Sequence, residues 1–341
     1  MIDACDGYSA LQPNQRKEFL VNEPKVSVCV VTYNQEKYIR ECLQSIVKQD
    51  ADFDFEVIVG DDESTDGTRA IIAEFAEAYP GIVKPLFHEK NVGPTQNYLS
   101  VHNRARGRYI AHLDGDDYCL QGKLKRLASH LDANPDCRLV WHRMHIINEH
   151  GQAAVGMPVT PISKFIPGSR IYARDMAKYY GITGCHSGSM YRASARKIYA
   201  RDEETLDYFF SLSFVIDGGY ASYIEEPYGV YRFFSNEYTL TKSKGNVITG
   251  NGKLSLIESY LCSNPELAKQ FAAQCIFDFF LRAYLRYPLK WAFLKMFFRC
   301  RAIPLITDIL LIAKVFNSNR SGILKQRFSM NDEAVFYMNG N

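Results

Sequence analysis

Three carboxylates fall within four positions in the stretch LDGDD, residues 113–117, directly after the apolar-leaning run RYIAH. Like charges about 4 Å apart repel by about 1 kcal/mol in bulk water, and by more near a protein surface. A divalent cation held by one or two of these carboxylates would offset the repulsion and bridge to phosphates of a substrate. Oxygen ligands favour Mg²⁺ or Mn²⁺ over zinc. The spacing alone leaves open which of Asp114, Asp116 and Asp117 contacts the metal.

Strands and helices are expected to alternate around this cluster. Apolar runs of strand length lie at 25–33, 55–62, 82–89, 107–114 and 137–148. Runs with helical periodicity lie at 34–49, 66–79, 93–106 and 122–135. This alternation predicts an open, doubly wound, mostly parallel α/β sheet flanked by helices, in which ligands bind outside the carboxyl ends of the strands. Asp61 and Asp62 follow the second strand as residues 114–117 follow the fourth, so we expect both acidic clusters at one sheet edge.

Several polar residues have interpretations other than metal binding. Asn34 and Asp66 precede helical runs and are expected to cap them. Residues 62–67 resemble the start of an EF-hand loop, but the twelfth position of that loop would be Ala73 instead of glutamate, which excludes it. His142, His145 and His150 are close in sequence, but the first two would face opposite sides of a strand, so a shared metal is not expected.

Composition narrows the class of protein. The nine cysteines are scattered without a C-x-x-C pair, which indicates neither a disulfide framework nor a zinc knuckle and favours a reduced, cytosolic setting. The net charge of +2 gives no indication of nucleic-acid binding. The apolar stretch 302–313 is shorter than the roughly 20 residues that a membrane span needs.

The motifs of residues 25–150 occur in a fixed order. They read VSVCVVTYNQEKYIRECLQSIVKQ, then FEVIVGDDESTDGT, NVGPTQNYLSVHNRARGRYIAHLDGDD and GKL. This succession resembles glycosyltransferase family 2, with the GT-A fold, closely to about residue 150 and more loosely to about 240. The resemblance implies transfer of a sugar from a nucleotide diphosphate donor to an acceptor hydroxyl, with inversion. No Q-x-x-R-W motif occurs, so the resemblance is to non-processive enzymes, and the expected setting is bacterial polysaccharide, lipopolysaccharide or capsule biosynthesis.

The resemblance assigns roles on the nucleotide side of the site. Thr32 and Tyr33 would line the pocket for the base and the ribose. Asp62 would accept a hydrogen bond from the base, usually a uracil N–H, so a UDP-linked donor is expected. The cleft on this side would be framed by Asn91, Gly93 and Asn97.

The D-x-D motif of the family matches Asp114 and Asp116. Asp116 would contact Mn²⁺ or Mg²⁺ directly, and Asp114 would bind the ribose or the sugar, or serve as a second metal ligand. Asp117 would orient Asp116 or the donor sugar. Arg232, in the segment EEPYGVYRFF, would contact the diphosphate.

The resemblance also assigns the acceptor side, where the acceptor would be a glycan or a lipid-linked saccharide. The segment TLDYFFSLSF resembles the one that carries the general base of the family, which makes Asp207 the candidate base. The alternative is that Asp207 is an ordinary residue at a helix start or on the surface. His186 and Ser187, in GITGCHSGSMYR, would contact the acceptor, with a structural role for His186 as the alternative.

The chain is expected to comprise five segments: a polar leader without a signal peptide (1–24), the nucleotide-sugar-binding half (25–150), the acceptor-side half (151–240), a helical region (253–316) and a tail (317–341).

The helical region contains the basic, aromatic stretch 277–301, which Pro288 is expected to divide into two helices. Arg282, Arg286 and Lys290 are four residues apart, as are Lys295 and Arg299. Such helices lie in a membrane interface, or they pack on the core with solvated basic sides; the sequence leaves both open. The expected location is the cytoplasm, with peripheral attachment to the inner face of the plasma membrane as the alternative.

Three other functions compete with the transferase. A sugar-nucleotide pyrophosphorylase would need a Gly-rich loop with arginine, where this chain has VVTYNQEKY. A dinucleotide oxidoreductase would need G-x-G-x-x-G after the first strand. A catalytically silent nucleotide-sugar-binding or scaffolding protein would predict erosion of the D-x-D motif or the base, and both are present in the sequence.

Overall fold

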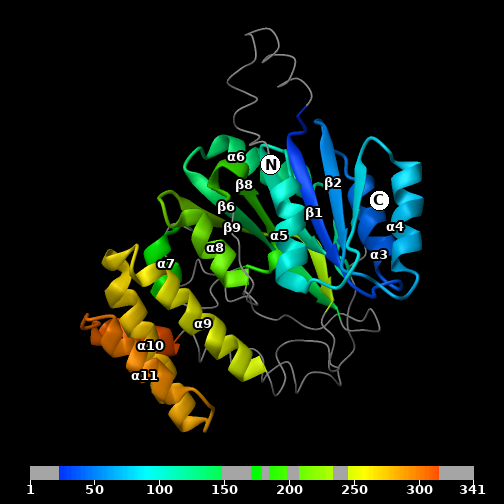
Figure 1. Ribbon diagram of the computed structural model, residues 1–341. Coiled ribbons are helices and arrows are strands. Elements are labelled where there is room, and N and C mark those ends of the chain that lie inside the picture. The colour runs from blue at the N-terminus through cyan, green and yellow to red at the C-terminus, as the bar shows by residue number, and fades with distance from the viewer. Residues whose placement is uncertain (1–22, 148–169, 179–183, 198–206, 233–244, 315–341) are drawn as a thin grey trace, which may run out of the picture.

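The computed structural model describes residues 23–147, 170–178, 184–197, 207–232 and 245–314. In these ranges nine strands form one mixed sheet in the order β3-β2-β1-β4-β8-β6-β9-β5, with β7 paired to β9 (Figure 1). The strands are β1 (Val26–Thr32), β2 (Phe55–Asp61), β3 (Val83–Phe87), β4 (Tyr109–Asp114), β5 (Tyr118–Cys119), β6 (Cys137–Ile147), β7 (Arg170–Ile171), β8 (Ser189–Arg192) and β9 (Tyr220–Arg232).

The amino-terminal half of the sheet is parallel. β1 lies between β2 and β4, and β3 pairs with the outer side of β2. β1, β2 and β4 are apolar runs buried on both faces, which is typical of parallel strands covered by helices on each side. Pro85 fits β3 because this strand lies at the sheet edge. The predicted α/β architecture is therefore confirmed.

The second half of the sheet mixes directions. β8 is antiparallel to β4 and to β6, whereas β6 and β9 pair in parallel over their length. The sequence around Pro227 predicts short separate strands, but β9 is one strand of 13 residues. Register shifts on either side of Arg143 in β6 absorb the extra residues of β9, so Pro227 sits at a bulge and the pairing continues past it.

Helices cover both faces of the sheet (Figure 1). One core cluster contains residues of α3 (Ile39–Val47), α4 (Thr68–Ala78) and α6 (Lys123–Ala133). The other contains residues of α5 (Pro94–Arg104), α7 (Ala173–Lys178) and α8 (Asp207–Val215). Successive side chains of β1 point to opposite faces of the sheet and so enter both cores. Val28 and Val30 lie in the first core cluster, and Cys29 between them lies in the second.

The two expected caps differ in outcome. Asn34 does not cap α3, which begins at Ile39; it adopts a positive φ of 53°, and its side chain accepts a hydrogen bond from the backbone N–H of Thr65. Asp66 stands one residue before the N-cap of α4, and its carboxylate accepts bonds from the N–H and hydroxyl of Thr68. Asp66 therefore satisfies the first turn of α4, as a capping carboxylate does.

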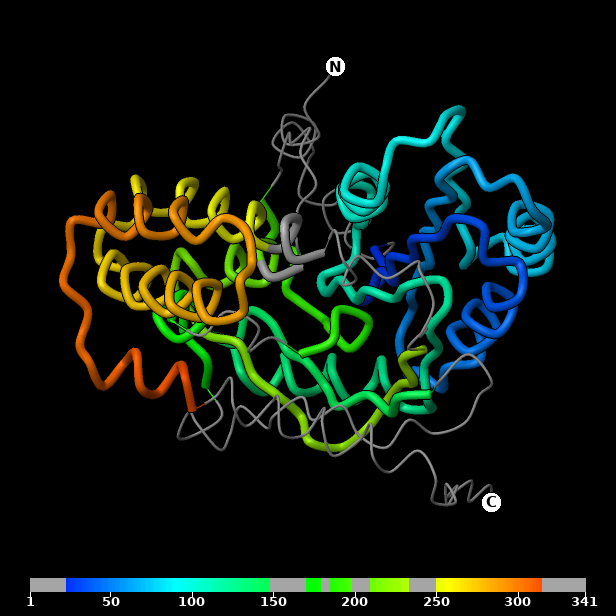
Figure 2. The backbone as a smooth tube through the Cα atoms, turned by 90° about the horizontal axis from the view of Figure 1, so that it is seen from below, coloured from blue at the N-terminus to red at the C-terminus, as the bar shows by residue number. Residues whose placement is uncertain are grey.

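The carboxyl-terminal helices form a lobe beside the sheet, in which α9, α10 and α11 lie together (Figure 2). They are α9 (Gly245–Leu261), α10 (Ala268–Tyr284) and α11 (Lys290–Arg299), with the 3-10 turn η5 (Pro265–Leu267) before α10 and a further helix at 306–314. α9 begins at Gly245, inside a polar stretch for which the sequence predicts no helix. Pro288 separates α10 from α11 as expected. None of the helices in the described ranges has the length and apolarity to cross a membrane.

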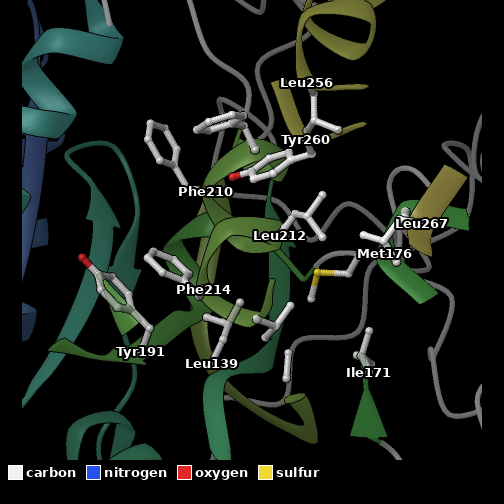
Figure 3. Packing of buried hydrophobic residues seen from close by; sticks show 14 of the residues in the cluster. Leu139, Ile171, Met176, Tyr191, Phe210, Leu212, Phe214, Leu256, Tyr260 and Leu267 are labelled. Atoms are coloured by element: carbon white, nitrogen blue, oxygen red, sulfur yellow. The ribbon is translucent and has the colours of Figure 1, made fainter. Parts of the chain in front are cut away.

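The lobe joins the sheet through a continuous apolar core. Figure 3 shows Phe210, Leu212 and Phe214 of α8 lying between the strand residues Leu139 and Tyr191 and the α9 residues Leu256 and Tyr260. The rings of Tyr191 and Phe214 are stacked 3.9 Å apart, and those of Phe209 and Tyr260 lie 5.2 Å apart. From Phe209 onward, α8 is therefore packed on both sides.

Candidate active site

The two acidic clusters meet at the carboxyl end of β1. Thr32 pairs in register with Asp61 of β2, and Val31 pairs with Asp114 of β4. Parallel strands end at the same edge, so the three chain segments converge there, as the sequence predicts. Gly115 packs so closely that a Cβ atom would lie 2.8 Å from Cβ of Thr32 and 2.5 Å from Oε1 of Gln35. The central residue of LDGDD must therefore be glycine for this loop to close over β1.

Asp62 organises the loop that carries Asn91 and Gly93. The buried Asp62 carboxylate accepts hydrogen bonds from the backbone N–H groups of Val92, at 2.7 Å, and Gly93, at 3.0 Å. The Asn91 side chain donates to the backbone carbonyl of Asp62 at 3.0 Å. Gly93 has φ +85° and immediately precedes α5, a conformation that a side chain would strain. The predicted nucleotide-side residues thus form one connected loop system around Asp62.

The remaining predicted residues of this side differ in exposure. Thr32 is buried, and its hydroxyl donates to Oε1 of Gln35 at 2.7 Å. Asn97 is also buried and donates to the carbonyl of Gly60 at 2.9 Å, so it packs beneath the strand end. Tyr33 is 48% exposed. Tyr33 therefore offers an accessible ring beside the buried supports, which suits stacking on a base.

Asp114 is held by protein groups on both carboxylate oxygens. Oδ1 lies 3.1 Å from Nε2 of His112, and Oδ2 accepts a bond from the Ser187 hydroxyl at 3.1 Å. Burial by itself raises the pKa of Asp114, but the hydrogen bonds from His112 and from Ser187 outweigh it and lower the pKa below its usual range. The Asp114 side chain is still 36% exposed, so a fixed, ionised carboxylate faces the site.

The pKa values of Asp116 and Asp117 are raised, in contrast to that of Asp114. Burial first and the charge of Asp114 second raise the pKa of Asp116 to about 7. Burial and both neighbouring carboxylates raise the pKa of Asp117 well above its usual range. Asp117 is fully buried; its Oδ1 accepts the backbone N–H of Arg232, and its Oδ2 has no hydrogen-bond partner in the described residues. A cation beside Asp116 would relieve the repulsion that raises these pKa values.

The donor set suits a hard divalent cation that takes few protein ligands. In the described ranges no group of three or more His, Cys, Asp or Glu side chains is assembled to hold a metal. Mg²⁺ and Mn²⁺ sites on nucleotide substrates use one or two carboxylates together with phosphate oxygens and water, which matches Asp114 and Asp116. His142 is buried and His145 exposed, as predicted for opposite strand faces, while His150 lies outside the described residues.

Arg232 braces the D-x-D loop. Its guanidinium donates to the backbone carbonyl of Asp116 at 2.5 Å and bonds to the carboxylate of Glu41. The guanidinium also lies over the rings of Tyr38 and Tyr118, at 5.0 and 5.1 Å from their centroids. Only 10% of the Arg232 side chain is exposed. In this arrangement the charge of Arg232 supports the loop beside the site, and any bond to a diphosphate remains a prediction.

The 3-10 turn η3 (His186–Gly188) packs beneath the same loop. Ser187 is buried and bonded to Asp114, and His186 stacks on the His112 ring at 4.0 Å. The fully buried Lys123, at the start of α6, donates to the carbonyl of Ser187 at 2.5 Å. The turn that the sequence assigns to the acceptor side is therefore also a support for Asp114.

Asp207 is the first residue of α8, and its side chain lies outside the described part of the structure. Phe210, one turn further along α8, stacks on Tyr98 at 4.3 Å. Tyr98 in turn stacks on His186 at 5.1 Å and lies 5.2 Å from the His112 ring. The start of α8 is thus linked by three ring contacts to the residues beneath Asp114.

Sequence reasoning missed the supporting residues Gln35, Glu41, His112 and Lys123. His112 was within reach, because it lies two positions before Asp114 and therefore on the same face of β4. Lys123 follows Gly122 in the GKL motif, but nothing in its sequence context indicates full burial.

Comparison with known proteins identifies the family of this fold. The model of glycosyl transferase family 2 matches residues 27–198, just over half of the chain. Bacillus subtilis TuaG, named as a teichuronic acid biosynthesis glycosyltransferase, is 27% identical over 223 residues, which are 65% of this chain and 84% of TuaG. Mycobacterial relatives that are 39% identical match over only 37% of their own length, and they are uncharacterised.

Two solved structures have the same GT-A fold. S. aureus TarS 1–349 in complex with UDP-GlcNAc superposes with a TM-score of 0.58 at 20% identity, covering 89% of each chain. The Pyrobaculum calidifontis mannosyltransferase PcManGT, in complex with GDP-Man and Mn²⁺, gives a TM-score of 0.52 at 15% identity over 97% of each chain. With the matched family model and the predicted motifs in place at one sheet edge, the chain belongs to glycosyl transferase family 2.

Proposed function

We propose that this protein transfers one sugar from a UDP-linked donor to a hydroxyl of a glycan or lipid-linked saccharide, with inversion at the anomeric carbon. The observation that carries the proposal is the meeting of Asp62, Asp114 and Asp116 at the carboxyl end of β1. That edge is where nucleotides bind in open α/β sheets. The donor assignment is supported by the UDP-GlcNAc complex of TarS, and the polysaccharide setting by the name of TuaG.

The reaction requires a base, a positioned donor and a stabilised leaving group. Asp207 takes the proton of the acceptor hydroxyl while its oxygen bonds to the anomeric carbon. The bond from that carbon to the phosphate oxygen breaks on the opposite face, its electron pair leaves with UDP, and a single displacement inverts the centre. Asp114 and Asp116 hold the donor and Mn²⁺ or Mg²⁺, which when bound offsets charge on the diphosphate. Asp62 and Tyr33 orient the nucleotide, so that attack occurs within one complex.

A screen of nucleotide sugars tests this function. The full-length protein is incubated with UDP-, GDP- and dTDP-sugars with and without Mn²⁺, and thermal shift and release of nucleotide diphosphate are measured. We expect a UDP-sugar to raise the melting temperature and to be slowly hydrolysed only when the metal is present. Stabilisation without hydrolysis or transfer would favour a silent binding protein. No response to any nucleotide sugar would reject the proposal.

We further propose that the helical lobe contacts an anionic membrane surface. Phe280 and Tyr284 of α10, and Trp291 and Phe298 of α11, are 61–78% exposed, although the opposite sides of both helices pack in the core. Exposed basic residues accompany these rings at Arg286, Lys295 and Arg301. Arg282 is not among them, because it is buried and donates to the carbonyl of Pro288. Exposed aromatics beside basic side chains match the requirements of an anionic lipid interface.

Flotation with vesicles tests this contact. The full-length protein is expected to float with vesicles that contain phosphatidylglycerol and to remain unbound to pure phosphatidylcholine. The double variant Trp291→Ala/Lys295→Glu should lose most of the bound fraction, because it removes an interfacial ring and reverses one charge. Lys48→Glu is the matched control, an exposed charge reversal at the end of α3. Equal loss of binding in both variants would refute a specific surface on the lobe.

A further inference from the structure

Three buried side chains form a continuous hydrogen-bonded chain that ends on Asp114. The hydroxyl of Tyr191 lies 2.7 Å from Nδ1 of His102, and Nε2 of His102 lies 3.0 Å from Nδ1 of His112. Nε2 of His112 then lies 3.1 Å from Oδ1 of Asp114. Tyr191, His102 and His112 are each at most 2% exposed. The chain therefore connects the core of the molecule to the first carboxylate of the D-x-D motif without reaching solvent on the way.

The elements hold this chain rigidly. His112 and Asp114 share one face of β4, Tyr191 lies on the neighbouring strand β8, and His102 comes from α5 packed above them. Ring stacking fixes the imidazoles, because Tyr98 lies 3.7 Å from the ring of His102. Figure 3 shows the Tyr191 ring beside Phe214, with its hydroxyl directed out of the apolar cluster.

The direction of the protons follows from hydrogen-bond satisfaction. An ionised Asp114 only accepts, so Nε2 of His112 donates to it. Nδ1 of His112 then accepts from Nε2 of His102, which leaves Nδ1 of His102 to accept from the Tyr191 hydroxyl. In the reverse order, His112 carries protons on both ring nitrogens and donates from Nδ1 to His102, and Nδ1 of His102 donates to the Tyr191 hydroxyl. The buried hydroxyl proton of Tyr191 would then have no acceptor in the described residues. An unsatisfied buried donor is costly, so the first order is favoured.

The ionisation of the members agrees with this order. Burial lowers the pKa of His102 well below its usual range, which keeps that ring neutral. Burial, then the neighbouring Cys29, raise the pKa of Tyr191 well above its usual range, which keeps its hydroxyl protonated.

We propose that His112, backed by His102 and Tyr191, is a positioning residue for Asp114, through a chain in which each proton points toward the carboxylate. One lone pair of Asp114 Oδ1 is committed to His112, and one of Oδ2 to Ser187. A carboxylate has about four acceptor sites, so two remain, and their direction is fixed toward the site. The inference rests on the proposed function, because it assigns those sites to hydroxyls of the nucleotide-sugar donor or to its metal.

The tautomers of the two histidines test the chain without any ligand. In the ¹⁵N-histidine-labelled full-length protein at neutral pH, two-bond ¹H–¹⁵N correlations should show His102 and His112 both protonated at Nε2 alone. The variants His102→Gln and His112→Gln assign the signals by their loss. A proton on Nδ1 of His102, or a doubly protonated His112, would overturn the proposal. This result does not depend on whether the protein proves to be a transferase.

Affinity for UDP with Mn²⁺, measured by calorimetry, tests the consequence. We expect His112→Phe, which keeps an aromatic ring but removes the donor, to weaken UDP binding about tenfold or more, since bonds to charged groups are the stronger ones. His112→Gln should recover most of this loss by placing an N–H near the position of Nε2. Tyr191→Phe should weaken binding a few-fold through the same path.

Tyr223→Phe is the matched control. It removes a buried hydroxyl of the same core cluster that has no hydrogen-bond partner in the described residues. Unchanged UDP affinity in His112→Phe, or equal losses in Tyr191→Phe and Tyr223→Phe, would refute the positioning role. If His112→Phe fails to fold, the positioning role is still tested by the UDP affinities of Tyr191→Phe and Tyr223→Phe and by the histidine tautomers. If the wild-type protein binds no UDP, the proposed donor is rejected. The histidine tautomers measured by NMR would still test the hydrogen bonds from Tyr191 to Asp114.

Discussion

Replacement of Asp116 by alanine is expected to lower kcat/KM for sugar transfer by about 10³-fold, since a bound cation contributes several kcal/mol to the developing charge and each 1.36 kcal/mol is tenfold in rate. Asp116 combines a raised pKa with a partly exposed carboxylate, whereas Asp117 is buried and bonded to the N–H of Arg232, so Asp116 is the carboxylate that a cation can reach. Titration of UDP into Asp116→Ala should show the same weak affinity with and without Mn²⁺. Asp136→Ala, an exposed aspartate just before β6 at the opposite sheet edge, serves as control.

The same substitution is expected to stabilise the metal-free protein. The pKa of Asp116 is raised from 3.8 to about 7, so between these values the native state binds more protons than the unfolded state, and stability falls as pH rises. Asp116→Ala removes this loss, so it should melt above the wild type at pH 8, with the difference vanishing near pH 4. Cation affinity of the wild type should fall as pH drops below 7, because the proton competes. Metal-independent loss of activity together with a lower melting temperature at pH 8 would contradict the assignment.

Asp207→Asn is expected to reduce transfer by about 10²- to 10⁴-fold, the usual contribution of general-base catalysis. Asparagine matches aspartate in size but does not take a proton from the acceptor hydroxyl. Asp207 begins α8, which from Phe209 onward packs between the sheet and α9, and Phe210 stacks on Tyr98. Binding of UDP should therefore stay within about twofold of the wild type, since the substitution leaves the nucleotide side intact.

Asp217→Asn is the matched control for this variant. Asp217 follows the other end of α8, is exposed and pairs with Lys197 at 2.7 Å, so its loss should leave transfer unchanged. A parallel loss of UDP binding and transfer in Asp207→Asn would reject the base assignment and indicate a structural role for the start of α8.

The parallel half of the fold was predictable because its strands are apolar runs with a strong local signal. The acidic clusters follow two of these runs, so their meeting beside Thr32 needed only the rule that parallel strands end at one edge. The continuous β9 was not predictable, since proline argues against a strand and the compensating register shift lies in β6, about 85 residues away. The start of α9 at Gly245 was also missed, because the polar stretch there lacks an apolar stripe.

In the candidate site, too, some residues could be predicted from the sequence and others could not. Residues that would touch the donor stand in local motifs, so Asp62, Asp114 and Asp116 could be singled out from their order. The residues that hold them come from distant segments, as with Lys123, whose bond to the Ser187 carbonyl spans 64 positions. A buried lysine that bonds a backbone carbonyl leaves no periodic pattern, and only the tertiary fold shows it.

The hydrogen bonds of Arg232 to the D-x-D loop have a consequence for biosynthesis. The backbone N–H of Arg232 bonds to Asp117, and its guanidinium bonds to the carbonyl of Asp116, which left the ribosome more than a hundred residues earlier. Chains emerge and fold from the amino terminus at about 5–20 residues per second. The parallel strands are complete several seconds before β9 exists to lock the loop. The contacts that hold residues 116 and 117 therefore become available only after a strand that is synthesised several seconds later.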